Sequence, residues 1–115
     1  LSQRYPRASC MSAVLDDVLN PPVRLQIAAI LARANEAEFA IIRDIVEVSD
    51  SVLSKHLSAL AEAGYVSIKK VPRDGRQRTW AALTAEGRRA FRQHARALQE
   101  MISAADRKFS DIATT

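Results

Sequence analysis

The stretch LSKHLSALAEAGYVSIKK, residues 53–70, changes its apolar period from 3.6 to 2 near its middle, and this change decides the fold. Leu53, Leu57 and Leu60 lie within about 60° of one another on a helical wheel, so we expect them to face a core. Gly64 is a natural left-handed stop for that helix. Because the apolar residues after it alternate, the stretch predicts a helix joined directly to a strand.

A second short helix precedes this one in AIIRDIVEV, residues 40–48. Its apolar residues are expected to share one helical face: Ile41, Ile42, Ile45 and Val46. Ser49 and Asp50 then offer N-cap side chains for the following helix, which we predict over residues 50–63. Since about three residues separate the two helices, the pair is a helix-turn-helix candidate.

The face of the helix over 50–63 that lies opposite its leucines is small and polar. Such a face lets a helix lie close to base edges in the major groove of DNA. His56 lies about 60° from the core side, so either a packing role at the boundary or a phosphate contact fits it. The alternative for the whole helix is the solvated face of an ordinary bundle. The candidate major-groove residues are Ser51, Ser54, Lys55, His56 and Ser58.

A charged hairpin follows this helix. Residues 65–71 predict its first strand, PRDGRQR (72–78) its turn, and TWAAL (79–83) the returning strand. An arginine-rich tip suits a narrow minor groove, where the negative potential of DNA is concentrated. The competing interpretation is an edge hairpin that its charges keep soluble. The candidate residues for contact with DNA in the minor groove or on the backbone are Lys69, Lys70, Arg73, Arg76 and Arg78.

Two further helices and a short strand are expected earlier in the chain. SAVLDDVLN, residues 12–20, has apolar residues at helical spacing, and two prolines end that helix and start the next one. The next helix lies within residues 21–35, with Asn35 as its C-cap. Residues 37–40 can pair as an edge strand. The resulting order of helix, strand, helix, helix and hairpin is that of a winged helix.

A long helix is predicted from Thr84, an N-cap candidate, to residue 112, with apolar positions four and three apart as in a heptad seam. It would be roughly 42 Å long and would project past a domain whose radius of gyration is about 13 Å. We therefore expect a second copy to cover the seam in a two-fold dimer; the alternative is that the helix folds back over its own domain. The expected interface residues are Leu15, Leu19, Phe91, Leu98, Ile102, Phe109 and Ile112.

Residues 53–70, followed by PRDGRQRTWAALTAEGRRAF (72–91), resemble the small bacterial winged-helix transcriptional regulators of the MarR/ArsR type. In that family a Leu-Ser-x-His-Leu recognition helix ends in Leu-x-x-x-Gly-Tyr/Leu-Val, and the wing ends in Leu-Thr-x-x-Gly. The resemblance spans roughly residues 15–95. It places Ser51, Ser54, Lys55 and His56 at the groove, makes Arg73, Arg76 and Arg78 the wing, and gives Leu83, Thr84 and Gly87 structural roles.

The expected fold is mainly α with a small β-hairpin wing, a winged helix-turn-helix with a long C-terminal dimerisation helix. We expect a flexible N-terminal extension over residues 1–11, a winged helix DNA-binding domain over 12–84 and a dimerisation helix over 85–115. The function expected is a homodimeric, sequence-specific transcriptional regulator that binds an inverted repeat in double-stranded DNA. The alternative is a winged helix that binds other proteins and not DNA.

Other function classes are disfavoured by what the sequence lacks. Neither a nucleophile paired with a base nor two carboxylates at catalytic spacing are evident, so we do not expect an enzyme. Cys10 is the single cysteine, which excludes an internal disulfide and the cysteine pairs of metal-sensing ArsR proteins; we expect no metal and no cofactor. No residue identifies a small-molecule effector.

The length and composition fit one small domain, since 48% of the 115 residues are hydrophobic and 26% are charged. No apolar run reaches the roughly 18 residues that a membrane span needs, and residues 1–20 lack the order of a secretory signal. We therefore expect a cytoplasmic protein with no membrane partner.

The net charge of +4 is unevenly distributed along the chain. Between Lys69 and Arg96 there are nine basic residues and two acidic ones, whereas the remainder has eight basic and eleven acidic residues. We expect this basic segment to form a surface beside the recognition helix, where the phosphates of DNA would lie.

Overall fold

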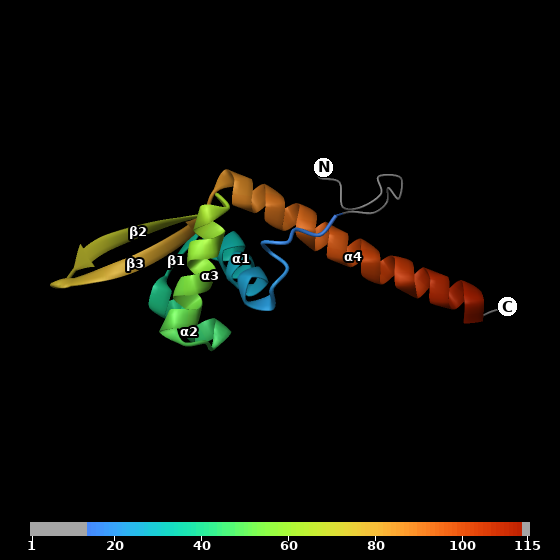
Figure 1. Ribbon diagram of the computed structural model, residues 1–115, viewed down its shortest axis with the longest axis horizontal. Coiled ribbons are helices and arrows are strands. Elements are labelled where there is room, and N and C mark those ends of the chain that lie inside the picture. Colours follow the sequence, from blue (N-terminus) through green and yellow to red (C-terminus); the bar gives the residue numbers. More distant parts are fainter. Residues whose placement is uncertain (1–13, 114–115) are drawn as a thin grey trace.

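The computed structural model describes residues 14–113, which form four helices and a three-stranded antiparallel sheet (Figure 1). The order of strands in the sheet is β1-β3-β2, so the short β1 is an edge strand and β2 and β3 form a hairpin. The predicted winged helix is confirmed. The elements are α1 (Pro22–Ala34), β1 (Glu36–Glu38), α2 (Phe39–Val46), α3 (Asp50–Glu62), β2 (Val66–Arg73), β3 (Arg76–Leu83) and α4 (Ala85–Ala113).

The core lies where α1, α2 and α3 pack on one another and on the base of the hairpin (Figure 1). As predicted, the three leucines of α3 face this core: Leu53, Leu57 and Leu60 are at most 2% exposed. Burial of each such side chain contributes about 1.5–3 kcal/mol. The core therefore fixes which face of α3 remains outside.

The ends of the early helices follow the sequence closely. Asn35 is the C-cap of α1, as expected; its φ is positive, at 70°, and its backbone N–H donates to the carbonyl oxygen of Leu31. Ser49 is the N-cap of α3, and its Oγ accepts the backbone N–H of Val52 at 3.2 Å. Gly64 stops α3 with a φ of 84°, which few residues other than glycine adopt. The extension predicted over residues 1–11, including Cys10, lies outside the described residues.

The prediction of a helix over residues 12–20 is wrong, since residues 14–20 form a turn and no helix. Asp16 Oδ1 accepts the backbone N–H groups of Val18 at 2.8 Å and of Leu19 at 3.2 Å, which closes a local turn that competes with a helix. Leu19 is fully buried in the core of its own chain, so its predicted place in a dimer interface is also wrong.

The edge strand expected at residues 37–40 is confirmed with shifted bounds, because α2 already begins at Phe39. The prediction that four apolar residues of α2 share a core face holds only in part. Ile42 is fully buried, but Ile41 is 51% exposed and Ile45 is 57% exposed. The buried side of α2 is formed by Phe39, Ile42 and Val46, which are three and four residues apart, so Ile41 and Ile45 lie on the other side of the helix.

The turn of the hairpin is shorter than the expected residues 72–78. Only Asp74 and Gly75 lie between the strands, with φ values of 54° and 74°. Two central residues with positive φ are the mark of a type I′ turn, whose twist matches that of the flanking strands. Arg73 and Arg76 therefore face each other across the tip, as the last pair of the ladder.

Helix α4 has 29 residues and projects well past the domain, as predicted (Figure 1). The structure extends over 68 × 32 × 22 Å and its radius of gyration is 17.5 Å, against about 13 Å for a compact chain of this length. The helix packs on the domain through Gly87, His94 and Ala97, which are its buried residues. The seam residues Ile102, Phe109 and Ile112 stay exposed, because they lie on the part of the helix that projects past the domain (Figure 1).

Candidate DNA-binding surface

The outer face of α3 carries the side chains that the sequence predicted for the major groove. Ser51, Ser54, Lys55 and Ser58 are all exposed, whereas His56 is half-buried at the flank of the helix. Within residues 14–113 these serines form no hydrogen bond to a charged side chain; Ser51 Oγ lies 3.3 Å from Ser49 Oγ, at the start of the helix. Small hydroxyl groups that can donate or accept a hydrogen bond are thus presented together with one cation.

His56 is held by a residue that the sequence interpretation missed. Arg24, in the first turn of α1, donates from Nε to His56 Nδ1 at 3.0 Å. Burial, first, and then the charges of Arg24 and Lys55 lower the pKa of His56 below its usual value. The imidazole is therefore kept neutral at the edge of the candidate surface.

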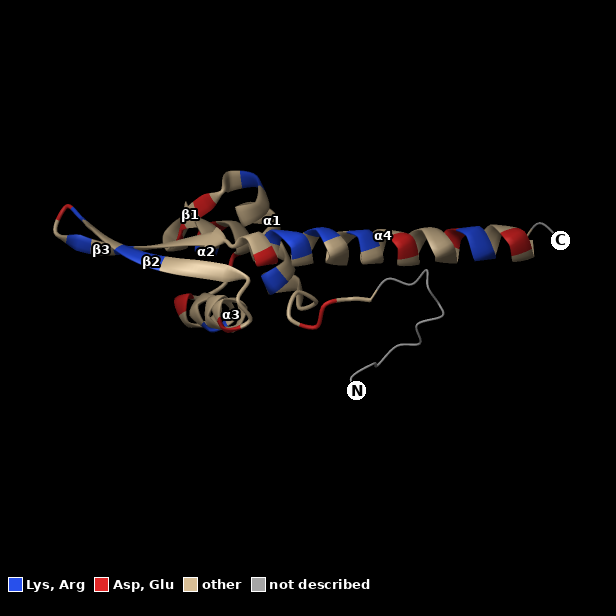
Figure 2. Ribbon diagram, turned by 90° about the horizontal axis from the view of Figure 1, so that it is seen from above, with Lys and Arg blue, Asp and Glu red and all other residues tan. Residues whose placement is uncertain are grey.

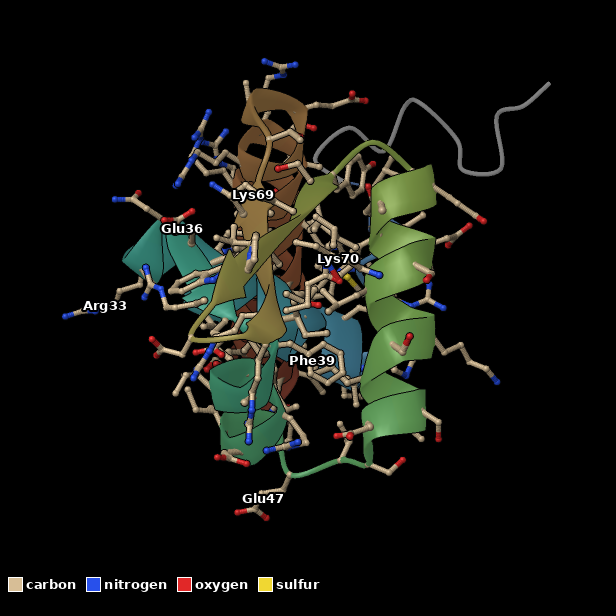
Figure 3. The ribbon with its side chains drawn as sticks, turned by 90° about the vertical axis from the view of Figure 1, so that its left-hand side faces the viewer. Arg33, Glu36, Phe39, Glu47, Lys69 and Lys70 are labelled. Carbon is tan, nitrogen blue, oxygen red and sulfur yellow. The ribbon has the colours of Figure 1, made fainter. Side chains whose placement is uncertain are left out.

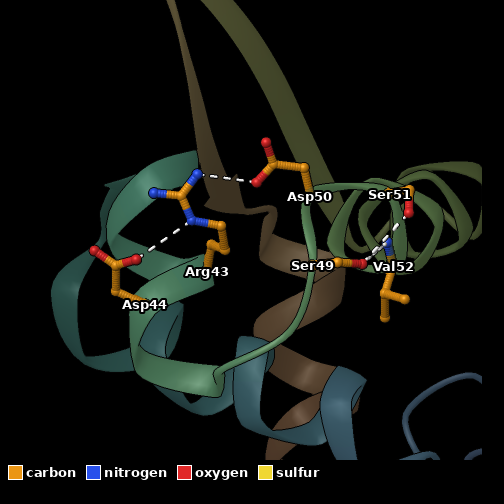
Figure 4. A network of polar contacts seen from close by, with 6 residues as sticks. All are labelled: Arg43, Asp44, Ser49, Asp50, Ser51 and Val52. Atoms are coloured by element: carbon orange, nitrogen blue, oxygen red, sulfur yellow. Dashed lines mark hydrogen bonds and ion pairs between the residues drawn. The ribbon is translucent and has the colours of Figure 1, made fainter.

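A second missed group lies at the turn between α2 and α3 (Figure 4). Arg43 of α2 donates to Asp50 at 2.9 Å and to Asp44 at 3.3 Å. The hydrogen bond to Asp50 is the largest cause of the raised pKa of Arg43. Because Asp50 begins the recognition helix, Arg43 offsets the negative charge that lies next to Ser51 at the start of the candidate major-groove face.

The two lysines of the hairpin point to opposite faces of the sheet, because alternate residues of a strand do so. Lys70 shares a face with the buried Val66 and points to the side of α3, whereas Lys69 points to the other side, where Glu36 lies 3.9 Å away (Figure 3). The structure thus brings Lys70, and not Lys69, to the side of the recognition helix.

The three arginines of the hairpin differ in the same way. Arg73 and Arg76 are exposed on either side of the tip and form no ion pair within residues 14–113. Arg78 lies further down β3, is half-buried and donates to Glu38 of β1 at 2.9 Å. Its charge is therefore largely neutralised by Glu38, and the free arginines of the wing are the two at its tip.

The basic segment that continues into α4 does not gather beside α3 as expected. Figure 2 shows Lys and Arg along the first half of α4, on the far side of the domain from the wing. Arg88 bonds to the C-terminal end of α1, at the carbonyl of Ala32 (3.3 Å) and at Asn35 Oδ1 (3.1 Å). The local excess of positive charge is thus divided between the wing and α4.

Behind the candidate surface, Asp16 joins three parts of the fold. Its Oδ2 accepts the hydroxyl of Tyr65 at 2.6 Å, and its backbone N–H donates to His94 Nδ1 at 2.8 Å. Burial, together with this bond to a carboxylate, raises the pKa of Tyr65 to about 12. His94 is fully buried, and its Nε2 has no hydrogen-bond partner within the described residues.

No local pattern in the sequence indicates these long-range partners. Arg24 lies in the first turn of α1, Arg43 in the last turn of α2 and Asp16 in a turn, and the partners named above lie 32, 7 and 78 residues away. In the part of the chain that the structure describes, no cluster of His, Cys, Asp or Glu could hold a metal ion. Nor is any helix between residues 14 and 113 both long and apolar enough to span a membrane.

Several known proteins are similar to this chain in sequence and in fold. The winged helix DNA-binding domain family matches residues 23–102. An uncharacterised protein of Methanocaldococcus jannaschii is 34% identical over 77 residues, which are 67% of this chain and 84% of that protein. A transcriptional regulator homologue from Pyrococcus horikoshii OT3 has a similar structure, with a TM-score of 0.73 and 29% identity over 77% of this chain and 88% of its own. HlyU from Vibrio cholerae N16961 has a TM-score of 0.57 and 26% identity over 69% and 82% of the two chains.

The family match covers the helix-turn-helix, the wing and most of α4. It agrees with the exposed polar face of α3 and with the free arginines at the tip of the wing. The chain therefore belongs to the winged helix DNA-binding domain family and is a DNA-binding transcriptional regulator.

Proposed function

We propose that the protein regulates transcription as a homodimer that binds an inverted repeat, with α3 in the major groove and the wing in the minor groove or on the backbone. The observation that carries the proposal is the placement of free polar and basic groups. The outer face of α3, Lys70 and the tip of the wing together present cations and hydrogen-bonding groups that no acidic partner occupies within residues 14–113.

In this arrangement the exposed side chains of α3 contact base edges. Serine hydroxyls can bond to any base, and Lys55 can reach guanine or a phosphate. His56, at the flank of the helix, is nearer to the wall of the groove than to its floor. We assign base contacts to Ser51, Ser54, Lys55 and Ser58, and a backbone contact to His56.

The wing contributes through Arg73 and Arg76, which flank the tip and are not paired. Guanidinium groups are less strongly hydrated than ammonium groups, and this favours their entry into a narrow minor groove. Lys69 and Arg78 were also expected here, but Lys69 forms an exposed ion pair with Glu36 at 3.9 Å and Arg78 is bonded to Glu38 at 2.9 Å, so we assign both a smaller contribution to DNA binding.

A second copy would bind along α4, which we take as a separate dimerisation element over residues 85–115. Ile102, Phe109 and Ile112 are 61%, 72% and 75% exposed on a helix that projects from its domain. Exposed apolar side chains in one row favour burial by a partner, and a two-fold dimer buries the same row twice. Of the remaining predicted interface residues, Phe91 and Leu98 are half-buried at the start of this row, and Leu15 is half-buried in the segment before α1.

The test is binding to DNA at several salt concentrations, followed by selection of bound sequences from genomic fragments. Each phosphate neutralised adds about −0.9 to the slope of log affinity against log salt, so affinity should fall steeply between about 50 and 200 mM. The selected sites should contain two inverted half-sites about one helical turn apart. A mobility shift that is absent at low salt would favour the alternative, a winged helix that binds proteins.

A further inference from the structure

The side chain of Arg24 is fixed at both ends of its guanidinium group. Nε donates to His56 Nδ1 at 3.0 Å, and one terminal nitrogen donates to the carbonyl oxygen of Val18 at 3.3 Å. Val18 belongs to the turn that Asp16 closes, and the backbone of Asp16 is bonded to the buried His94. A continuous chain of hydrogen bonds therefore runs from α4 through Arg24 to the recognition helix.

The bond from Arg24 determines which nitrogen of His56 carries the proton. Because Arg24 Nε can only donate, Nδ1 must accept and must be unprotonated. The imidazole is then neutral, and its proton lies on Nε2. The positive charges of Arg24, from α1, and of Lys55, from α3, oppose a second proton and lower the pKa of His56.

His56 is half-buried at the flank of α3, on the side of α1 and away from the outermost line of the helix that Lys55 and Ser58 occupy. When a helix lies in the major groove, its flanks face the phosphates of the groove walls and its outermost line faces the bases. A neutral N–H donor at the flank suits a phosphate oxygen, which accepts only.

We propose that Arg24 is a positioning residue, which fixes His56 as an Nε2–H donor to a phosphate oxygen at the wall of the major groove. This inference rests on the proposed function, because it requires α3 to lie in that groove. Arg24 itself does not contact DNA in this arrangement; it acts through the imidazole. Its contribution to affinity therefore requires the ring of His56 and is lost with it.

The experiment compares the full chain with Arg24→Ala, His56→Ala and the double variant, on a duplex selected by the wild type. Each single variant should bind about tenfold more weakly, the effect of losing one hydrogen bond to a charged group, and the double variant no more weakly than either single one. Arg33→Ala is the matched control, since it removes the same charge from the exposed end of α1 and should leave affinity unchanged.

Two further measurements separate positioning from direct contact. Long-range ¹H–¹⁵N spectra of the free protein should show the Nε2–H tautomer of His56 in the wild type and a mixture of both tautomers in Arg24→Ala. The salt slope should be the same in Arg24→Ala and the wild type, whereas an arginine that contacts phosphate would lower its magnitude by about 0.9 when removed.

Additive losses in the double variant, or a lower salt slope in Arg24→Ala, would overturn the positioning role. A loss in His56→Ala that depends on one base pair would overturn the assignment to phosphate. If the wild type bound DNA but His56→Ala bound equally well, the inference would fail and the proposed function would stand. If the wild type bound no DNA, both would fail, even with the Nε2–H tautomer present.

Discussion

Gly87 places its α-carbon against the backbone carbonyl of Tyr65 so closely that a β-carbon there would lie 2.1 Å from the carbonyl oxygen. The same oxygen accepts the backbone N–H of Thr84 at 3.0 Å. Thr84 Oγ1 donates to the carbonyl of Gly64 at 2.7 Å and accepts the N–H of Gly87 at 2.9 Å. These contacts lock the first turn of α4 to the end of α3, so the direction of α4 is fixed relative to the recognition helix.

Replacing Gly87 by alanine should therefore destabilise the fold by about 2 kcal/mol or more, since the clash is with backbone that cannot turn away. Urea unfolding followed by circular dichroism measures this loss. Gly75→Ala is the control, because a β-carbon there meets nothing within 4 Å and only the positive φ is strained, at a cost of about 1 kcal/mol. Equal losses in the two variants would contradict the close approach at Gly87.

Tyr65 should make stability depend on pH in the alkaline range. Its pKa is raised from 10.0 to about 12 in the folded chain, so the neutral hydroxyl is the form that folding favours. The stabilisation should be complete below about pH 10 and should be lost as the pH rises through 12.

The measurement is the free energy of unfolding in urea at pH 8 to 11.5, for the wild type and Tyr65→Phe. Lysines also titrate in this range, but they titrate in both proteins. Tyr65→Phe should be less stable at pH 8, because Asp16 loses the hydroxyl that donates to it at 2.6 Å, and the difference should shrink above pH 10. A difference that is constant with pH would contradict the raised pKa of Tyr65.

The sequence predicts the fold well where local chemistry determines it. The leucines of α3, the Ser49 cap, the stop at Gly64 and the apolar pattern of α4 depend on neighbours within one or two turns, and each lies where it was expected. The side chains of α3 that face outward could be read from the same helical wheel, since a buried face defines the opposite one.

The parts of the fold and of the candidate surface that the sequence does not predict depend on contacts between distant residues. The pattern of residues 12–20 is helical, but two backbone N–H groups bind Asp16 instead, and Leu19 fills the core. Lys69 and Lys70 are adjacent lysines in the sequence. Only the pairing of β2 and β1 with β3 shows that Lys69, and not Lys70, lies near Glu36. Such pairings carry no periodic signal, so the division of basic residues into free and paired groups had to come from the structure.

Arg76 and Arg78 should contribute unequally to DNA binding, although they are two residues apart on β3. Arg76→Ala should weaken binding to all sequences and lower the magnitude of the salt slope by about 0.9, because a free cation is lost. Arg78→Ala should change the slope less, since Arg78 is already bonded to Glu38 at 2.9 Å. Fluorescence anisotropy on one duplex at four salt concentrations gives both slopes; equal reductions would contradict the division.

Ile102→Asp tests the role of α4, because it places a carboxylate in the middle of the seam. Two such charges would meet across a two-fold axis, and like charges in an interface cost several kcal/mol, so the dissociation constant of the dimer should rise about a hundredfold or more. Sedimentation velocity at several protein concentrations measures this change, and binding to an inverted repeat should weaken with it while binding to one half-site does not.

Met101→Asp is the matched control for this variant. Met101 is 52% exposed, against 61% for Ile102, but it lies about 100° around the helix from it. On the helical wheel Met101 lies at the flank of the row, about 20° from Ile112 and about 60° from Leu98, whereas Ile102 lies within it, so the same charge at Met101 should disturb association less. If both variants associated as the wild type does, the exposed row would not be an interface between copies, and α4 would need another partner. If both dissociated equally, the contact would involve more of the helix surface than the heptad row.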